Sequence, residues 1–199
     1  MDKKIYTQDM VLELKPNTTY EQCIFDELDL SGRKLEECEF INCSFLSAKL
    51  TGTRFNNSVF TNCNLANATI TGCNFFSCTF NESKLLGLQF PACESLIGVT
   101  FEKCTLDYAN FRSLDLKKMD FSHSSCIETD FSLTNLDRVS FMNADLSHAV
   151  FNGVKFHMTD MRGATVTGLS LKNNVKGIIL TPKQLQDLGE AVGITILES

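Results

Sequence analysis

The sequence predicts an all-β fold, a square β-helix of about seven to eight coils followed by a short C-terminal α-helix. Two observations support this prediction. A large apolar residue recurs at every fifth position, and a small residue recurs two positions before it. A period of five fits neither an α-helix, with about 3.6 residues per turn, nor an ordinary strand, with about two. It suits a chain that turns through a right angle every five residues, so that four sides close one coil.

The large positions run from Phe25 to Phe90 and, after a slip of one residue, from Leu96 to Leu171. Phe and Leu occupy 26 of these 30 positions, and 15 of the 16 phenylalanines lie on them. From Leu96 to Phe151 the large positions alternate between Leu and Phe, broken only at Cys126, and residues one coil apart share a face. We therefore expect columns of stacked phenylalanine rings inside the coil, which add packing energy beyond their buried area.

The small positions explain most of the nine cysteines. Seven of them lie there, beside alanine, serine, threonine and valine at other small positions, and Cys126 takes a large one. A free cysteine behaves as a small apolar residue. Their spacing matches neither a disulfide framework nor a zinc site, so we expect core thiols. Cys93, within the register slip, has no assigned role.

The chain divides into three predicted parts. Residues 1–20 are expected to cap the N-terminal end, residues 21–174 to form the β-helix with a register shift at 91–95, and residues 175–199 to form a helix and strand module. Thr181-Pro-Lys-Gln184 has the pattern of a capping box with proline at the first helical position.

The segment Ser140-Phe-Met-Asn-Ala-Asp-Leu-Ser-His-Ala-Val-Phe151 resembles the signature of the pentapeptide-repeat family. The resemblance covers about residues 21–174 and implies a right-handed quadrilateral β-helix. The tail, residues 177–194, is similar to that of the Qnr-type, MfpA-like and AlbG-like topoisomerase-protecting group, whose members dimerise through this module. The resemblance implies a homodimer; a monomer in which the tail only caps the solenoid is the alternative. The implied dimer-interface residues are Ile178, Leu180, Leu185, Leu188, Val192, Ile194 and Ile196.

The resemblance also implies a function for the formal net charge of −6. A slender acidic rod would mimic DNA, occupy the DNA-binding surface of DNA gyrase or topoisomerase IV, and protect that enzyme from quinolones or a gyrase-directed toxin. A regulatory or scaffold protein with another protein partner is the alternative, which an exposed apolar patch around Phe76 would favour. The expected contacts with the topoisomerase are Asp107, Asp115, Asp120, Asp130, Asp137 and Asp145.

Other classes of function are disfavoured by what the sequence lacks. The three histidines lie outside the inward positions, and no nucleotide-binding or nucleophile motif is present. We therefore expect no catalysis, no cofactor and no metal. The acidic balance argues against direct binding of nucleic acid. Because no apolar stretch is long enough for a signal peptide or a membrane helix, we expect a cytoplasmic protein with no membrane contact.

Overall fold

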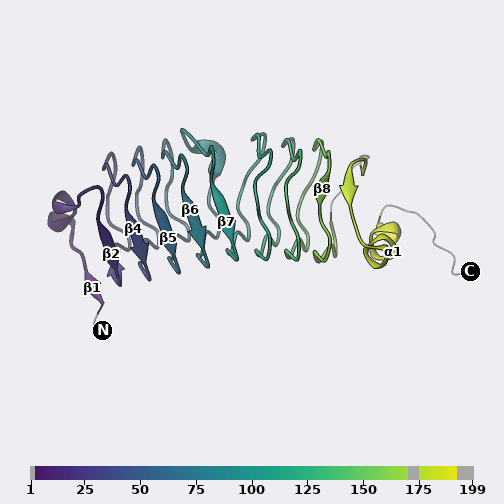
Figure 1. Cartoon of the computed structure of the whole chain (residues 1–199). Helices are drawn as coiled ribbons and strands as arrows, with labels where there is room; N and C mark the ends of the chain where they lie inside the picture. Colours follow the sequence, from purple (N-terminus) through teal and green to yellow (C-terminus); the bar gives the residue numbers. More distant parts are fainter. Residues whose placement is uncertain (1–2, 170–174, 192–199) are drawn as a thin grey trace, which may run out of the picture.

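The computed structural model describes residues 3–169 and 175–191. The chain forms a right-handed β-helix of about nine turns with a small C-terminal helix, which confirms the predicted fold class. The two ends of the chain lie at opposite ends of the rod (Figure 1). The expected seven to eight coils were too few, because residues on both sides of the repeat region also join the solenoid.

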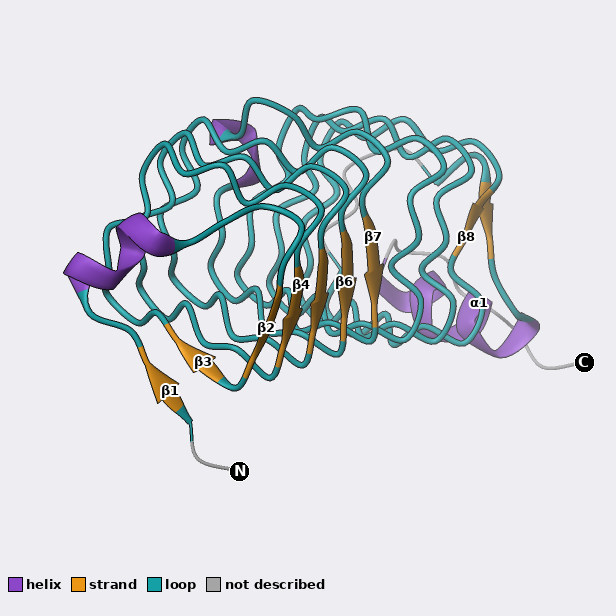
Figure 2. Cartoon of the chain, turned by 60° about the vertical axis from the view of Figure 1, so that its left-hand side comes forward, coloured by secondary structure: helices purple, strands orange, loops and turns teal. Residues whose placement is uncertain are grey.

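One side of the rod, face A, carries most of the regular strands. Five strands pair in parallel in the order β2, β4, β5, β6, β7 and lie side by side in Figure 2. Their bounds are β2 Thr19–Glu21, β4 Glu39–Ile41, β5 Val59–Thr61, β6 Thr79–Asn81 and β7 Thr100–Glu102. Face A continues through Asp120 and Ser140 to β8 (Thr159–Asp160), which pairs with β9 (Ile178–Ile179). β9 therefore adds a further rung to the solenoid.

The other three sides are held by single β-bridges between successive coils and follow face A in chain order. Face B starts where β1 (Lys4–Ile5) pairs with β3 (Cys23–Ile24) and continues through Ser44 to Thr165. Face C contains the bridges from Asp29 to Val150, and face D those from Lys34 to Lys155. Faces A and B are thus neighbours, and face D lies opposite face B.

The N-terminal residues form part of the coil as well as covering its end. β1 is a rung on β3, and the 3₁₀ helix η1 (Gln8–Glu13) follows it. The side chain of Gln8 donates to the carbonyl of Asp29 at 2.8 Å and accepts from the amide of the same residue at 2.9 Å. Gln8 thereby satisfies backbone groups of the first coil that have no preceding coil to pair with.

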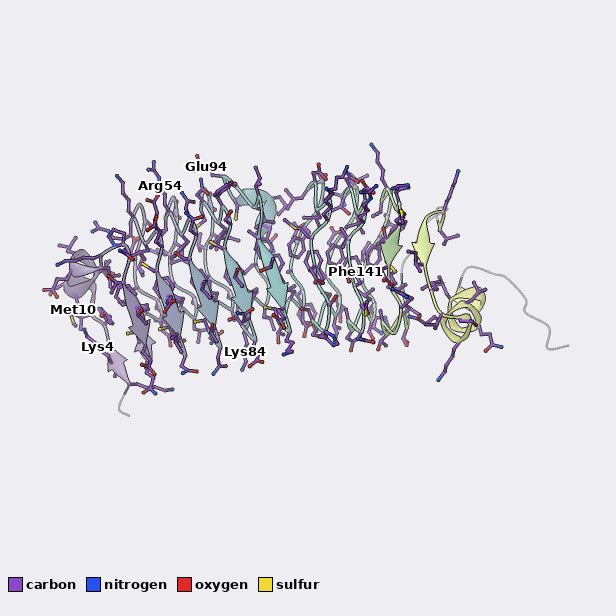
Figure 3. All side chains as sticks on the ribbon, in the orientation of Figure 1. Lys4, Met10, Arg54, Lys84, Glu94 and Phe141 are labelled. Atoms are coloured by element: carbon purple, nitrogen blue, oxygen red, sulfur yellow. The ribbon has the colours of Figure 1, made fainter. Side chains whose placement is uncertain are left out.

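The large residues fill the interior as predicted (Figure 3 places Phe141 within the coil). Phe101 stacks on Phe121 with ring centroids 5.3 Å apart, and Phe121 stacks on Phe141 at 5.2 Å. Rings on opposite sides, such as Phe121 of face A and Phe131 of face C, meet edge to face. The predicted aromatic columns are confirmed.

Most corners of the coil are β-turns whose third residue has a positive φ, as at Asn57 with φ of 58°. The turn is stabilised by an aspartate or asparagine that precedes many of the large residues. The carboxylate of Asp120, for example, accepts the amide of Ser122 at 2.9 Å. These short side chains replace a backbone acceptor in the turn, so much of the acidity of the chain has a structural role.

The register slip is a β-bulge on face D, preceded by the 3₁₀ helix η2 (Phe90–Ala92). The amides of Glu94 and Ser95 both donate to the carbonyl of Cys73, at 2.8 and 3.4 Å. Two residues opposing one is the definition of a bulge. Cys93 occupies the small position, since its Sγ lies 3.6 Å from the carbonyl oxygen of Ile70. Glu94 is therefore the inserted residue, and the pairing of β6 with β7 joins residues 21 apart.

Candidate protein-binding surfaces

Faces A and B are acidic over most of the rod, except in the coil of β5, where their outward positions carry no carboxylate. Their outward positions carry eleven carboxylates and three cations, and β1 adds the exposed Lys4 at the N-terminal end of face B. Two of the cations are paired on the same face, Lys103 with Glu82 and Arg162 with Asp160. The carboxylates are Glu21, Asp26, Glu27, Glu39, Glu82, Glu102, Asp107, Asp120, Glu128, Asp145 and Asp160.

Face D, by contrast, has more cations than carboxylates, and face C is balanced. Figure 3 shows Arg54 and Glu94 along the same edge of the rod, whereas Lys84 of face B lies along the opposite edge. The rod therefore has an acidic half and a neutral to basic half. Composition alone could not show this asymmetry, because it depends on which residues are one coil apart.

The six aspartates expected to contact a partner do not gather on one face. Asp107, Asp120 and Asp145 lie on the acidic faces A and B. Asp130 lies on face C, and Asp115 and Asp137 lie on face D. Only Asp115 and Asp120 are exposed; the other four are half-buried.

All six also form hydrogen bonds within the chain. Five accept an amide from a nearby turn, as Asp107 does from Ile127 at 3.1 Å. Asp137 instead lies between Lys117 Nζ at 2.9 Å and His157 Nδ1 at 2.7 Å. These two donors lower the pKa of Asp137 to about 2. The six aspartates therefore stabilise the fold through these bonds, and their contact with a partner stays a prediction.

The C-terminal end of the solenoid is closed by α1 (Pro182–Ala191). The predicted capping box is confirmed: Thr181 N–H donates to Gln184 Oε1 at 3.0 Å, and Gln184 N–H donates to Thr181 Oγ1 at 3.4 Å. The same buried glutamine reaches the last coil. Its Nε2 donates to the carbonyls of Met161 and Ala164 at 2.7 and 2.8 Å, and its Oε1 accepts the amide of Gly163 at 3.1 Å.

An apolar groove of about 410 Å³ lies between β9 and α1. It contains four of the residues predicted at a dimer interface, Ile178, Leu180, Leu185 and Leu188. Leu185 is 52% exposed, whereas Leu188 is buried in the core. The other three, Val192, Ile194 and Ile196, lie outside the described residues. Within this structure of one chain, the groove is an accessible surface that a second copy could cover.

An exposed apolar pair lies on face D beside the bulge. Phe76 is 45% exposed and Ile97 is 68% exposed. They occupy the same outward position in successive coils, because Ser77 N–H donates to the carbonyl of Ile97 just as Asn57 N–H donates to that of Phe76. The scaffold hypothesis expected an apolar patch at Phe76, and Ile97 is the partner that the register slip concealed.

No constellation of catalytic type stands out in the described part of the chain. No three His, Cys, Asp or Glu residues there are arranged to hold a metal ion. The nine thiols are unpaired, and eight of them are buried. Burial raises the pKa of Cys78 and of Cys104 to about 12, so both are protonated and unreactive at neutral pH.

Comparison with protein families agrees with this geometry. A model described as a pentapeptide repeat region matches residues 16–90, and one described as pentapeptide repeats (8 copies) matches residues 115–153 and 129–168. The chain is a pentapeptide-repeat protein. A search of curated protein sequences finds no match.

Solved structures share the fold of this pentapeptide-repeat protein. HetL, from the cyanobacterium Nostoc sp. strain PCC 7120 and involved in heterocyst differentiation regulation, matches with a TM-score of 0.69 and 22% identity over 82% of this chain and 79% of its own. Full-length QnrB1, a plasmid-mediated fluoroquinolone resistance protein, matches with a TM-score of 0.59 and 19% identity over 96% and 95%. At these identities the likeness establishes the fold alone.

Sequence reasoning missed two features of these surfaces in this pentapeptide-repeat protein: which faces of the rod carry the acidity, and that Ile97 lies beside Phe76. Both depend on aligning residues about 20 apart, and the repeat period itself was the signal that could have found them. No helix among the described residues is long and apolar enough to cross a membrane.

Proposed function

We propose that this pentapeptide-repeat protein is a non-enzymatic, cytoplasmic DNA mimic that binds DNA gyrase or topoisomerase IV and protects it from quinolones or a gyrase-directed toxin. The observation that carries the proposal is the acidic half of the rod formed by faces A and B. A surface that holds phosphates with Lys and Arg attracts such a rod through the same charges. The likeness to QnrB1 in fold is consistent with this role.

The proposal includes a homodimer joined at the apolar groove between β9 and α1. A second copy would cover Leu185 and extend the acidic rod across the junction. The groove leaves apolar surface in water in the single chain, which a symmetric interface would remove. The groove itself is the support for the dimer; the interface contacts remain a proposal.

A supercoiling assay with purified gyrase tests the proposal. The chain, titrated with and without a fluoroquinolone, should restore drug-inhibited supercoiling or inhibit the enzyme directly at higher concentration. The variant Glu39→Lys/Glu102→Lys, which reverses two charges on face A, should weaken the effect at least about tenfold. The matched control Glu36→Lys/Glu94→Lys on face D should leave it unchanged. A folded protein without any effect on the enzyme would exclude this function.

A regulatory or scaffold role with another protein partner is the second candidate. Two observations favour it, the likeness in fold to HetL and the exposed apolar pair Phe76 and Ile97. The two roles differ in the surface they use. Binding that depends on face D and not on Glu39 or Glu102 would identify the regulatory role.

A further inference from the structure

The last described rung of the solenoid leaves its inward residues uncovered in the single chain. β9 pairs with β8 so that Ile178 lies over Thr159. The amide of Met161 donates to the carbonyl of Ile179 at 3.0 Å, so Leu180 lies over Met161. Thr159 and Met161 are fully buried, whereas Ile178 and Leu180 are only partly buried. This rung lies just before α1 in Figure 1.

Val175 occupies the inward position that precedes this strand, on face D. It lies two residues before Gly177, which has a positive φ of 94°, just as Phe55 lies two residues before Asn57 at an earlier corner. The register of β9 on β8 places Val175 over Phe156. Phe156 is buried, but Val175 is 45% exposed. The interior of the solenoid is therefore open at this end, between the last described rung and α1.

The opening is the apolar groove between β9 and α1, and its floor is made of these inward residues. None of the residues that line it is charged. Thr181 has the one polar side chain of the lining, and its Oγ1 donates to Gln184 Oε1 at 2.8 Å. A lining of this kind is a core cut in half, which is the composition of interfaces between permanently associated copies. It has no free group with which to bind a charged or polar ligand.

Leu185 is the exposed apolar side chain at the edge of this opening. It lies one turn of α1 before Leu188, which is 4% exposed, whereas Leu185 itself is 52% exposed. The helix therefore closes the coil with Leu188 and leaves Leu185 beside the hole. One chain thus presents an apolar hole and an apolar projection side by side. Such a surface is self-complementary about a two-fold axis, because each copy supplies what the other lacks.

The opposite end of the rod is closed, which favours a two-fold pair over a head-to-tail filament. At the N-terminal end, Tyr6 covers Phe25 with ring centroids 4.6 Å apart, and Gln8 bonds the backbone of Asp29. The inward residues of the first coil, Tyr20 and Phe25, are buried in the single chain. A filament would need a complementary surface at both ends, whereas a two-fold interface uses the same surface twice and then closes.

We infer that Leu185 of a second copy inserts into the open last coil beside Val175, and that the same contact forms in the opposite direction. The interiors of the two solenoids thereby become one continuous core. The inference rests on the proposed homodimer and adds to it the pair of side chains that joins the copies. It does not depend on the topoisomerase, so the supercoiling assay and an association experiment on the purified chain can fail separately.

Two variants that cannot pair with themselves test the contact by sedimentation equilibrium. Leu185→Arg and Val175→Asp should each weaken dimerisation at least about a hundredfold, because each places two uncompensated charges at the junction. An equimolar mixture should dimerise within about tenfold of the natural affinity, since one contact becomes an ion pair and the other keeps its leucine and valine. Ile179→Asp, on the outer side of the same rung, is the matched control. It should dimerise normally and should not rescue Leu185→Arg.

Hydrogen exchange shows whether the second copy completes the coil, and it does not need the Val175 variant. The amide of Met161 should exchange at least about tenfold faster in Leu185→Arg than in the natural dimer. The amide of Phe141, which donates to Asp160 at 2.7 Å one rung earlier, should be unchanged and verifies that each variant is folded. Equal exchange of Met161 in the two proteins would overturn the inference. So would a mixture of folded variants that stays monomeric, or a natural chain that is itself a monomer.

Discussion

At the residue scale, the small inward positions are hydrogen-bonding positions as well as space fillers. Thr53 Oγ1 donates to the carbonyl of Leu30 at 2.8 Å, and Cys78 Sγ lies 2.9 Å from the carbonyl oxygen of Phe55. The acceptor in each case is the large residue 23 positions earlier, in the preceding coil. Ser58 forms two such bonds. Its Oγ donates to the carbonyl of Leu35 at 2.9 Å and accepts from the amide of Cys38 at 3.0 Å.

Ser58→Ala is therefore expected to destabilise the protein more than the loss of one oxygen suggests. It leaves a buried amide and a buried carbonyl without their partner, which costs about 1–3 kcal/mol. The free energy of unfolding in urea measures this loss. Thr51→Ala, at an exposed position on face C, is the control and should change stability by less than about 0.5 kcal/mol. Equal effects of the two substitutions would contradict the bridging role.

The buried thiols predict a loss of stability at alkaline pH. Burial raises the pKa of Cys23 to about 11 and that of Cys104 to about 12, against about 8.5 for an unfolded thiol. Below about pH 8.5 both states hold the proton. Above it, the unfolded chain releases protons that the folded chain retains, so unfolding becomes more favourable. Each fully buried thiol should lower the free energy of unfolding by about 1 kcal/mol between pH 8 and about 9.5. Urea unfolding measured at both pH values would contradict this if the midpoint stayed constant.

At the element scale, both ends of the solenoid use a glutamine to replace a missing coil. Gln8 bonds the backbone of Asp29 at one end, and Gln184 bonds Met161, Gly163 and Ala164 at the other. The bond from Gln184 to Met161 spans 23 residues, the same spacing as the bonds from the small positions. The side-chain amide of Gln184, which lies on a helix, thus takes the place of a small inward residue of a further coil.

Gln184→Ala should consequently loosen the C-terminal end. It leaves the carbonyl of Ala164 and the amide of Gly163 unpaired, removes one of the two donors to the carbonyl of Met161 and removes the capping box, an expected loss of about 2–4 kcal/mol. Lys183→Ala, on the exposed side of the same helix, is the matched control. Hydrogen exchange at Gly163 and the urea midpoint are the measurements. The capping role is wrong if the two variants are equally stable and equally protected.

The elements also show how far sequence reasoning reaches. The five-residue period predicted the buried rings of Phe101, Phe121 and Phe141. A regular repeat places every fifth side chain in the same orientation, so if one of them faces inward, all of them do. The period could not assign Cys93, because a slip of one residue fits either a bulge or a shifted corner. The structure identifies a bulge, since the amides of Glu94 and Ser95 both donate to the carbonyl of Cys73. Nor could the period place Gln184 against Met161, a contact set by how the helix folds back.

At the scale of the whole molecule, charge is distributed unequally around the rod and an apolar groove lies at its C-terminal end. The first feature arises because carboxylates clearly outnumber cations on faces A and B, whereas on face D six cations stand against five carboxylates. The six aspartates predicted as contacts were chosen along the chain, and the coil distributes them over all four faces. A proposed binding surface on a solenoid has to be chosen by face.

The apolar groove between β9 and α1 makes dimerisation the prediction that belongs to the whole molecule. Leu185→Arg places a charge in that groove at a position that is 52% exposed in the single chain, so it should not disturb folding but should oppose a second copy. Sedimentation equilibrium is expected to show a dimer for the natural sequence and a monomer for the variant. Leu12→Arg, at a position 70% exposed near the opposite end, is the matched control and should remain dimeric. A monomeric natural chain at micromolar concentration, or a dimer that persists in Leu185→Arg, would mean that the helix only closes the solenoid and that one rod acts alone.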